Sequence, residues 1–463
     1  MEKLSALILA AGAGTRMKSA LPKVLHPILG KPMIKYILDV IRTIKLDNKI
    51  VIIGNQKELV KRNLEDEKDI SFVIQDVQQG TGHAVMQVEK ELENYNGNVL
   101  ILYGDTPLLK KETIQNLIKS HNSTGAGVTI LTCVMTDPTG YGRIIRNSQN
   151  EVIKITEEKD TTILEKKVKE INTGIYCFNS RKLFEMLKFL QPDNKQKELY
   201  LTDVIEMFSK KKYKINTQEA ENQQEIMGIN NRSELAKVSE LIRKSILEYW
   251  MRNGVTIIHP ESTFIDADVK IENDVTIYPF TIIEGKSIIK SNCIIGPFSY
   301  VKDSSLSNGV ELNNSRVIKG IINKEAKVGP FANIRPGTVL EASTRIGNFC
   351  EIKKSHIGEG SKVSHLSYIG DSDIGKDVNI GAGTITCNFD GESKHKTIIE
   401  DNVFIGSNTN LIAPVSIKKG ALVAAGSTIT RNVPEKALGI AREKQFNIAE
   451  YNKKRKKKIS HNK

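Results

Sequence analysis

The sequence lacks the features of a membrane-embedded or disulfide-stabilised protein. No apolar run in the 463 residues approaches the roughly 20 residues that span a bilayer. The cysteines are few and dispersed, and no two of them form a CxxC pair: Cys133, Cys177, Cys293, Cys350 and Cys387. An odd, scattered set is typical of reduced thiols and argues against a zinc site. We therefore expect a cytoplasmic protein with no membrane partner.

Positive charge is not spread evenly along the chain. The formal net charge is +13, and seven of the lysines and arginines lie within residues 453–463. A terminal basic run is usually a solvated, disordered tail, although a nucleic-acid contact or attraction of phosphorylated substrates are alternatives. The rest of the chain has only a mild basic excess. We predict a disordered tail and no nucleic-acid partner.

What the second half does contain is an aliphatic residue at every sixth position. The series is unbroken from Ile265 to Val301 and continues with interruptions, through residues such as Ile318, to Ile429. In its later part, a small residue usually follows four places after each aliphatic one. A period of six fits neither an α-helix nor a meander, and it predicts a left-handed parallel β-helix of hexapeptide repeats. The aliphatic residues would fill the interior of the prism, and the small residues its corners.

The interruptions of this period are as informative as the period. They fall near residues 303–306, 318–328, 352–357, 369–374 and 386–399. In a repeat protein, residues that break the period are commonly loops on one face, and such loops often build binding sites. We therefore predict loops that leave the prism at these places.

The first half has a different pattern and predicts a second kind of domain. Strand-like segments at 6–9, 49–53, 98–103 and 128–134 alternate with amphipathic segments at 33–44, 82–92 and 111–120. This alternation favours a Rossmann-like α/β domain with a mixed, mostly parallel sheet that binds ligands at the carboxyl ends of its strands. The predicted order is an α/β domain over 1–229, a helical linker over 230–250, the β-helix over 251–452 and the basic tail over 453–463.

A glycine-rich turn follows the first predicted strand, in the sequence LAAGAGTRM from Leu9 to Met17. Glycines at a strand-to-helix turn expose backbone N–H groups to an anion. The turn is neither the dinucleotide fingerprint, because Met17 occupies the third glycine position, nor a Walker A loop. Arg16 and Lys23 add two cations that could bind a triphosphate and stabilise its transition state.

The pattern LAAGxGTRM…LPK resembles that of the sugar-nucleotide pyrophosphorylases. The resemblance implies a site for UTP and a sugar 1-phosphate, with Arg16 and Lys23 as catalytic cations and Asp105 and Asn230 as ligands of Mg²⁺. The residues that it implies for nucleotide-sugar binding are Leu9, Ala10, Ala11, Gly12, Lys23, Gln75, Gly80, Thr81, Tyr103, Gly104, Asp105, Gly142, Glu157, Asn172 and Asn230. Nucleotidyl transfer depends on positioning and on charge neutralisation at the phosphates, and it requires no protein nucleophile. Cationic side chains and metal ligands supply both effects.

Polar residues also gather where the six-residue period is interrupted. Arg335, Lys353, His365, Tyr368 and Lys394 place three cations, an imidazole and a phenol in one stretch of the β-helix. An imidazole titrates near neutral pH and can take a proton from an attacking amine. The group therefore predicts an anionic substrate next to a general base.

The order of the two parts, with the string NIGAGTITCNFD from Asn379 to Asp390, resembles the bifunctional N-acetylglucosamine-1-phosphate uridyltransferases / glucosamine-1-phosphate N-acetyltransferases. The resemblance implies that His365 is the general base for acetyl transfer from acetyl-CoA to glucosamine 1-phosphate. It assigns the sugar phosphate to Arg335, Lys353, Tyr368, Asn379 and Lys394, and acetyl-CoA to Ala382, Asn388, Phe389, Ser407, Ala425 and Arg442. Phe389 departs from the tyrosine that the family usually has, which puts one hydrogen bond in doubt.

The resemblance also implies an assembly of three chains whose acetyl sites lie between neighbouring prisms, so we expect a homotrimer. Two other hypotheses remain open from the sequence. One is a monofunctional sugar-1-phosphate nucleotidyltransferase whose β-helix is only structural. The other is a scaffold or nucleic-acid-binding protein that uses the solenoid and the basic tail.

Overall fold

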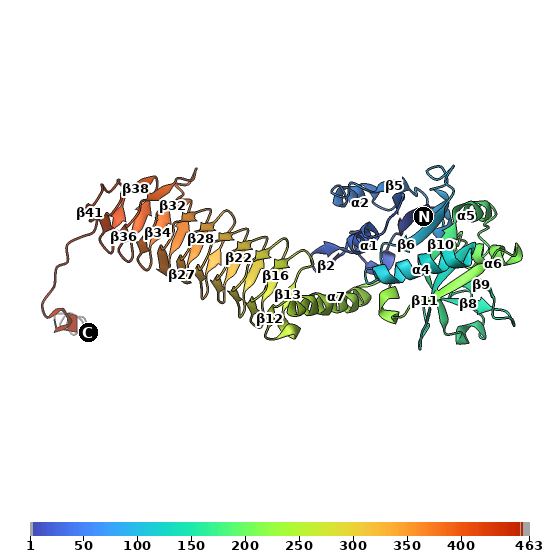
Figure 1. Ribbon diagram of the computed structural model, residues 1–463. Coiled ribbons are helices and arrows are strands. Elements are labelled where there is room, and N and C mark those ends of the chain that lie inside the picture. The colour runs from blue at the N-terminus through green and yellow to red at the C-terminus, as the bar shows by residue number, and fades with distance from the viewer. Residues whose placement is uncertain (1–2, 454, 457–463) are drawn as a thin grey trace. The chain divides into compact units, whose positions relative to one another are not determined.

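The computed structural model describes residues 3–453 and 455–456, so most of the predicted tail at 453–463 lies outside the described residues. The chain divides into two compact units, Met1–Lys244 and Ser245–Lys463, and the division falls inside helix α7 (Arg232–Arg252). Figure 1 labels many of the elements of both units. Within the described residues, no helix has an apolar stretch long enough to cross a bilayer.

The first unit is built on one mixed sheet, in the order β11-β7-β10-β6-β1-β4-β5, with β8 and β9 attached beside β10. Its strands are β1 (Leu4–Ala10), β4 (Asn48–Ile53), β5 (Ser71–Ile74), β6 (Asn98–Tyr103), β7 (Val128–Val134), β8 (Gly142–Arg146), β9 (Val152–Thr156), β10 (Glu170–Asn179) and β11 (Ile215–Glu219). Strands β6, β1, β4 and β5 are parallel, whereas β10 enters antiparallel between β6 and β7. The predicted mixed, mostly parallel sheet is confirmed.

Strand β1 lies inside the sheet, between β6 and β4, and every one of its side chains is apolar or small and buried. Such a continuous buried run is typical of a parallel strand covered on both faces. The covering helices are α1 (Met33–Arg42), α2 (Lys57–Asn63), α3 (Thr81–Met86), α4 (Lys111–Thr124), α5 (Ser180–Leu187) and α6 (Asp203–Lys210). Short 3₁₀ turns η1 (Thr15–Met17), η2 (Lys23–Leu25), η3 (Glu165–Lys167) and η4 (Gln223–Ile226) and the hairpin β2 (Pro27–Ile28) and β3 (Lys31–Pro32) complete the unit.

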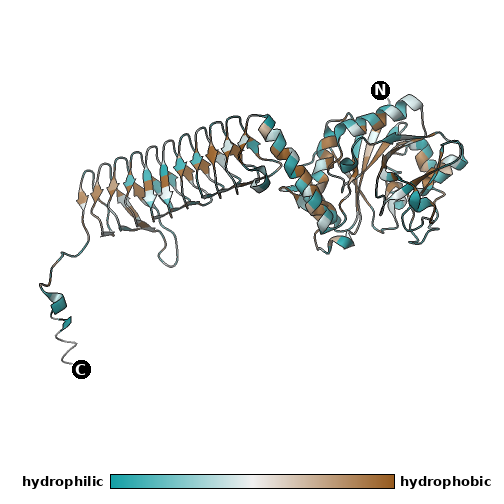
Figure 2. Cartoon of the chain, turned by 90° about the horizontal axis from the view of Figure 1, so that it is seen from below, coloured by the Kyte–Doolittle hydropathy of each residue, from teal (hydrophilic) through white to brown (hydrophobic). Residues whose placement is uncertain are grey.

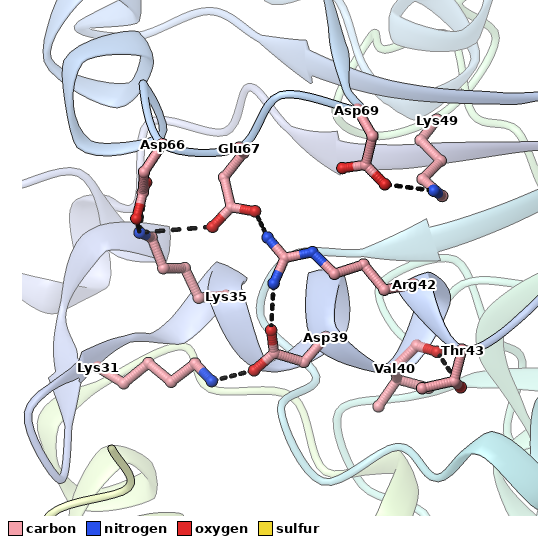
Figure 3. Close-up of polar contacts among 10 residues, drawn as sticks. All are labelled: Lys31, Lys35, Asp39, Val40, Arg42, Thr43, Lys49, Asp66, Glu67 and Asp69. Atoms are coloured by element: carbon pink, nitrogen blue, oxygen red, sulfur yellow. Dashed lines mark hydrogen bonds and ion pairs between the residues drawn. The ribbon is translucent and has the colours of Figure 1, made fainter. Parts of the chain in front are cut away.

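Helix α1 is fixed on its outer side by a network of ion pairs (Figure 3). Arg42 pairs with Asp39 and with Glu67, whose side chain is almost fully buried. Lys35 pairs with Asp66 at 2.7 Å and with Glu67 at 3.4 Å. Because the partners lie on the segment before β5, the network holds α1 and that segment in one arrangement.

The second unit contains three parallel ladders of very short strands, after the turn η5 (Pro260–Ser262). One ladder is β12 (Thr256–Ile257), β15 (Thr276–Ile277), β18 (Ile294–Ile295), β21 (Glu311–Leu312), β24 (Lys327–Val328), β27 (Arg345–Asn348), β30 (Lys362–His365), β33 (Asn379–Ile380), β36 (Phe404–Ile405), β39 (Leu422–Val423) and β41 (Leu438–Gly439). The next is β13 (Phe264–Ile265), β16 (Ile282–Glu284), β19 (Tyr300–Lys302), β22 (Arg316–Ile318), β25 (Asn333–Ile334), β28 (Glu351–Lys353), β31 (Tyr368–Gly370), β34 (Ile385–Cys387), β37 (Asn410–Ile412) and β40 (Thr428–Ile429). The last is β14 (Lys270–Ile271), β17 (Ile288–Ile289), β20 (Ser305–Leu306), β23 (Ile321–Ile322), β26 (Val339–Leu340), β29 (His356–Ile357), β32 (Ser372–Ile374), β35 (Thr397–Ile399) and β38 (Val415–Ile417).

Consecutive strands belong to successive ladders, so the chain winds around a prism whose stacked rungs are visible in Figure 2. Ile265, Ile283 and Val301 are 0% exposed, as the six-residue period predicts. The small residues four places on, such as Thr344 and Ser361, are also fully buried. The parallel β-helix is therefore confirmed, with one correction. Val317 fills the interior where the sequence pattern suggested Ile318, which is only half-buried.

Most of the interruptions do not form loops, which corrects the prediction. The interior residues Leu312, Val317 and Ile322 follow one another at intervals of five, and their strands still pair in register with the next rung. The shortened corners place Asp303, Lys319, Lys354 and Asp371 in the left-handed region, at φ between 47° and 49°. One missing residue is thus absorbed by a tighter corner. Among the described residues, the segment between β34 and β35 does leave the prism, and it folds back on itself through a bridge between Phe389 and Lys394.

Candidate active sites

The first unit has a cavity of about 500 Å³ at the carboxyl ends of β1 and β6. The catalytic cation Arg16 and most of the residues predicted to bind a nucleotide sugar line it: Leu9, Ala10, Ala11, Gly12, Lys23, Gln75, Gly80, Thr81, Tyr103, Asp105 and Asn230. Gly104 lies just behind the lining, where its N–H donates to the carbonyl of Leu9 at 3.0 Å. The sheet edge predicted from the strand pattern is thus where these side chains meet.

The glycine-rich loop brings two cations to this cavity. Gly14 has φ 62°, and a Cβ on it would lie 2.8 Å from the Cβ of Lys23. Only glycine allows this approach without strain, because other residues avoid that conformation and the contact is shorter than van der Waals distance. Arg16, in the turn η1, reaches Asn230 with an Nη2 to Oδ1 distance of 2.8 Å.

Asp105 and Asn230 both contact the ammonium group of Lys23. Lys23 forms an ion pair with Asp105, and its Nζ lies 3.3 Å from Oδ1 of Asn230. Backbone and side-chain contacts fix this arrangement. The N–H of Ile229 donates to the carbonyl of Asp105 at 3.0 Å, and Glu234 accepts from the N–H of Asn230 at 2.7 Å.

The donor set suits a magnesium ion that also binds phosphates. Asp105 offers a carboxylate and Asn230 an amide oxygen, and a single positive charge already contacts both oxygens. Mg²⁺ prefers oxygen ligands and is usually held by one or two protein carboxylates together with water and substrate phosphates. The residues therefore fit this ion, although they would not form a complete cage without substrate.

The segment from Gln75 to Thr81 forms a rigid wall of the cavity. Gln75 is 3% exposed and its amide donates to the carbonyl of Gly80 at 3.1 Å. Gly80 has φ 108°, and a Cβ there would lie 2.6 Å from the carbonyl oxygen of Leu199. Gln78 donates to the carbonyl of Ala11 at 2.7 Å, which connects the wall to the glycine-rich loop.

Gly142 on β8, Glu157 directly after β9 and Asn172 on β10 form a second group that does not line the cavity itself. A Cβ on Gly142 would lie 3.4 Å from Oε2 of Glu157 and 3.5 Å from Cβ of Asn172. Burial raises the pKa of Glu157, while a hydrogen bond from Thr202 opposes the change. Tyr103 lines the cavity, and burial and then the nearby Glu157 and Asp105 carboxylates raise the pKa of its phenol.

Some residues of this site carry no motif that the sequence pattern singled out. Glu198 lines the cavity, Thr202 holds Glu157, and Glu234 holds Asn230. Glu234 could have been found from the sequence, because Asn231 and Glu234 have the three-residue spacing of a helix capping box. In the structure, the N–H of Glu234 donates to the side chain of Asn231 at 2.9 Å. Glu198 and Thr202 come from a distant loop and are brought in only by the fold.

In the second unit, the predicted general base and three predicted acetyl-CoA residues form one column. Lys362 pairs with Asn379, Asn379 with Phe404, and Phe404 with Leu422. The residues three places after these are stacked on successive rungs, about 4.8 Å apart: His365, Ala382, Ser407 and Ala425. The guanidinium of Arg442 donates to the carbonyl of Ala425 at 2.7 Å and so marks the end of the column.

The predicted sugar-phosphate residues lie on the neighbouring ladder. Arg335 donates to Glu351 at 2.8 Å, and Glu351 pairs in register with Tyr368. The ammonium of Lys353 is the main cause that lowers the pKa of Lys394, which indicates that the two cations converge. Two converging ammonium groups beside a tyrosine are typical of an anion site. Asn379 lies one ladder away, on the rung after His365.

The loop after β34 carries the remaining predicted residues. Asn388 is 7% exposed and donates to Asp371 at 2.5 Å, whereas the ring of Phe389 is mostly exposed. Asp390 accepts from the N–H groups of Glu392 and Ser393, at 2.8 and 2.7 Å, which closes the loop. Glu351 and Asp371, which bind Arg335 and Asn388, were not predicted. In the sequence, an acidic residue in a rung cannot be distinguished from an ordinary surface residue.

Comparisons with known proteins agree with this two-part organisation. The Nucleotidyl transferase family matches residues 5–252, the Bacterial transferase hexapeptide (six repeats) family matches 268–303, and the Hexapeptide repeat of succinyl-transferase family matches 396–431. The chain is 48% identical over 448 residues to the Bifunctional protein GlmU of Carboxydothermus hydrogenoformans, covering 97% of this chain and 100% of the relative. It is also 48% identical to the Bifunctional protein GlmU of Acetivibrio thermocellus, over 96% of both chains, and to that of Geobacillus sp., over 97% of this chain and 98% of the relative.

The similarity extends over both units, which favours the bifunctional hypothesis over a nucleotidyltransferase with a purely structural β-helix and over a scaffold. The chain belongs to the family of bifunctional GlmU proteins and is an enzyme with a uridyltransferase and an acetyltransferase activity, as predicted for the synthesis of UDP-N-acetylglucosamine.

Proposed function

We propose that the cavity of the first unit transfers a uridylyl group from UTP to N-acetylglucosamine 1-phosphate. The observation that carries this assignment is the convergence of Arg16, Lys23, Asp105 and Asn230 on one point of the cavity. Mg²⁺ held by Asp105 and Asn230 would supply charge neutralisation and orientation at the phosphates. An oxygen of the sugar phosphate attacks the α-phosphorus of UTP, and pyrophosphate leaves.

The chain's own residues have separate tasks in this reaction. Arg16 and Lys23 stabilise the negative charge that moves to the leaving pyrophosphate. Gln75 to Thr81 form the rigid wall that holds the base, and the group of Gly142, Glu157 and Asn172 binds the sugar. The raised pKa of Glu157 reflects its burial, which the hydroxyls of a bound sugar would offset by hydrogen bonds.

The second unit, by this proposal, acetylates glucosamine 1-phosphate before uridylyl transfer. The amine nitrogen attacks the thioester carbonyl of acetyl-CoA, forming an amide bond, and the C–S bond breaks to release coenzyme A. His365 accepts the proton that the amine loses and returns it to the departing thiolate. Arg335, Lys353 and Lys394, with Tyr368 and Asn379, hold the sugar phosphate at the adjacent ladder.

The column above His365 suits an extended thioester. Ala382, Ser407 and Ala425 have small side chains on successive rungs, which leaves a shallow track along the prism. A pantetheine chain lying on this track would place its thioester at His365 and its phosphates toward Arg442. Asn388 and Phe389 border the track from the loop after β34.

We also propose that the protein is a cytoplasmic homotrimer. A ridge of half-exposed apolar side chains, interrupted on one rung by Asn314, runs along one corner of the prism: Phe280, Phe298, Phe331, Phe349 and Leu366. All five have φ between 47° and 59°, a conformation that costs free energy in bulky residues. The ridge ends beside His365, so a second copy that covers it would complete the wall of the acetyl site.

A single incubation tests the proposed reactions. The protein, glucosamine 1-phosphate, acetyl-CoA, UTP and Mg²⁺ should yield UDP-N-acetylglucosamine, coenzyme A and pyrophosphate, identified by mass. Omitting UTP should stop the reaction at N-acetylglucosamine 1-phosphate, and omitting acetyl-CoA should leave the amine unmodified. Formation of UDP-glucosamine as the main product would contradict the proposed order. A monomeric mass in solution would contradict the proposed assembly.

A further inference from the structure

A buried histidine lies directly behind Lys23 in the first unit. His26 follows the turn η2, is 2% exposed, and donates its backbone N–H to the carbonyl of Lys23 at 3.2 Å. Its own carbonyl accepts from the N–H of Met33 at 3.1 Å, at the start of α1. Because the ion pairs in Figure 3 fix α1, the histidine connects the turn that carries Lys23 to a rigid part of the unit.

The contacts of the imidazole determine its protonation. Nη1 of Arg232 lies 3.2 Å from Nδ1 of His26, and a guanidinium can only donate, so Nδ1 must accept and the proton must be on Nε2. Within the described residues Nε2 is buried and has no hydrogen bond of normal length. Burial and the charge of Arg232 lower the pKa of His26, while the carbonyl of Leu21 opposes them. The imidazole is therefore neutral.

Arg232 occupies a position where a cation is otherwise unfavourable. It is the first residue of α7, and the helix dipole disfavours positive charge in the first turn. Its Nε donates to the carbonyl of Met17 at 3.4 Å, next to Arg16 in the glycine-rich loop. It also lies two residues after Asn230. The guanidinium of Arg232 thus contacts both the loop that carries Arg16 and the histidine that lies behind Lys23.

We propose that His26 is a positioning residue for uridylyl transfer, which acts through its bond from Arg232 to hold Lys23, Arg16 and Asn230 in one arrangement. This proposal rests on the role assigned above to Lys23, Arg16 and Asn230. Neither His26 nor Arg232 lines the cavity. We therefore expect substitution of either residue to lower kcat for uridylyl transfer, with little change in KM for UTP.

Three variants in the full-length chain test the proposal: His26→Leu, His26→Asn and Arg232→Met. Leucine fills the space but accepts no hydrogen bond, and we expect it to lower kcat for uridylyl transfer roughly 10- to 100-fold. Asparagine places an oxygen near the position of Nδ1, and we expect it to recover activity to within about threefold of the original enzyme. Acetyl transfer by the same chain should not change in any variant, because its residues belong to the second unit, and an unchanged KM for UTP would report that the first unit is folded.

The coupling between the two residues gives an independent measurement. If they act as one connection, the double variant His26→Leu/Arg232→Met should lose no more activity than the more affected single variant. His121→Leu is the matched control, because it removes another buried imidazole that bonds Thr129 and Asn98 instead of Lys23. It should lower the melting temperature without changing kcat.

Three results would overturn the proposal: full uridylyl transfer in His26→Leu, a failure of His26→Asn to recover activity, or losses that multiply in the double variant. If the original enzyme itself made no nucleotide sugar, the proposed function would be wrong and the positioning role would lose its basis. The two failures are thus distinguishable from one set of assays.

Discussion

Replacing Asp105 with asparagine should separate the two activities of the chain. The side chains of Lys23 and Asp105 are 17% and 14% exposed, and the substitution removes the charge while it preserves the shape. Lys23 would keep only neutral partners, the new amide oxygen at position 105 and the amide oxygen of Asn230 at 3.3 Å. Loss of one member of a fully buried ion pair lowers the free energy of unfolding by about 3–5 kcal/mol. Because the pair is partly exposed and Lys23 keeps other partners, we expect the first unit to lose about 2 kcal/mol of stability.

The effect on the reaction should be larger than the effect on stability. Removing a charged ligand from a metal that neutralises phosphate charge costs several kcal/mol in the transition state, so uridylyl transfer should fall roughly 1,000-fold. Acetyl transfer, measured by release of coenzyme A from the same preparation, should stay within about twofold, because Asp105 belongs to the first compact unit. If acetyl transfer fell in parallel in a folded protein, the assignment of two independent sites would be refuted.

Other substitutions give further tests. His365→Asn should lower acetyl transfer roughly 100- to 10,000-fold and leave uridylyl transfer intact, and equal loss of both in a coupled assay would contradict the role of His365. Gly14→Ala should lower uridylyl transfer because its Cβ would meet that of Lys23 at 2.8 Å, whereas Gly125→Ala, with a similar φ but no atom within 4 Å, should not. Burial raises the pKa of Asp203 from 3.8 to about 6, so its ionisation destabilises the fold progressively above pH 3.8 and fully above pH 6. Asp203→Asn should therefore raise the melting temperature at pH 8, by an amount that corresponds to at most about 3 kcal/mol, and a gain of equal size at pH 5 would contradict this explanation.

The sequence predicted those parts of the fold that repeat or alternate. A six-residue period determines which side chains enter a prism, so the interior residues and small corner residues could be named in advance. The boundaries of β6 and β7 were also predicted, because buried strands are short, mostly apolar runs rich in β-branched residues. The antiparallel entry of β10 could not be predicted, because strand direction depends on connections that leave no local pattern.

The site shows the same division. Residues within motifs, such as Lys23 and Asp105, were predicted, and the structure brings them together. Residues that support them, such as Glu198, Thr202 and Asp371, come from segments distant in sequence and have ordinary surface composition. The five-residue corners were misread as loops, because a missing residue and an inserted one disturb a period in the same way. Only the strand pairing, which continues in register across these corners, tells them apart.

Those shortened corners have a consequence for how this chain can change during evolution. Each rung pairs only with its neighbours, and the strands that follow a shortened corner are again in register with the next rung. Deletion of one residue at a corner is therefore a neutral mutation in its effect on the rest of the prism. Deletion of one residue within a strand would instead turn an interior isoleucine to the solvent. Natural variants of the prism should accordingly differ in length at corners and keep their strands constant.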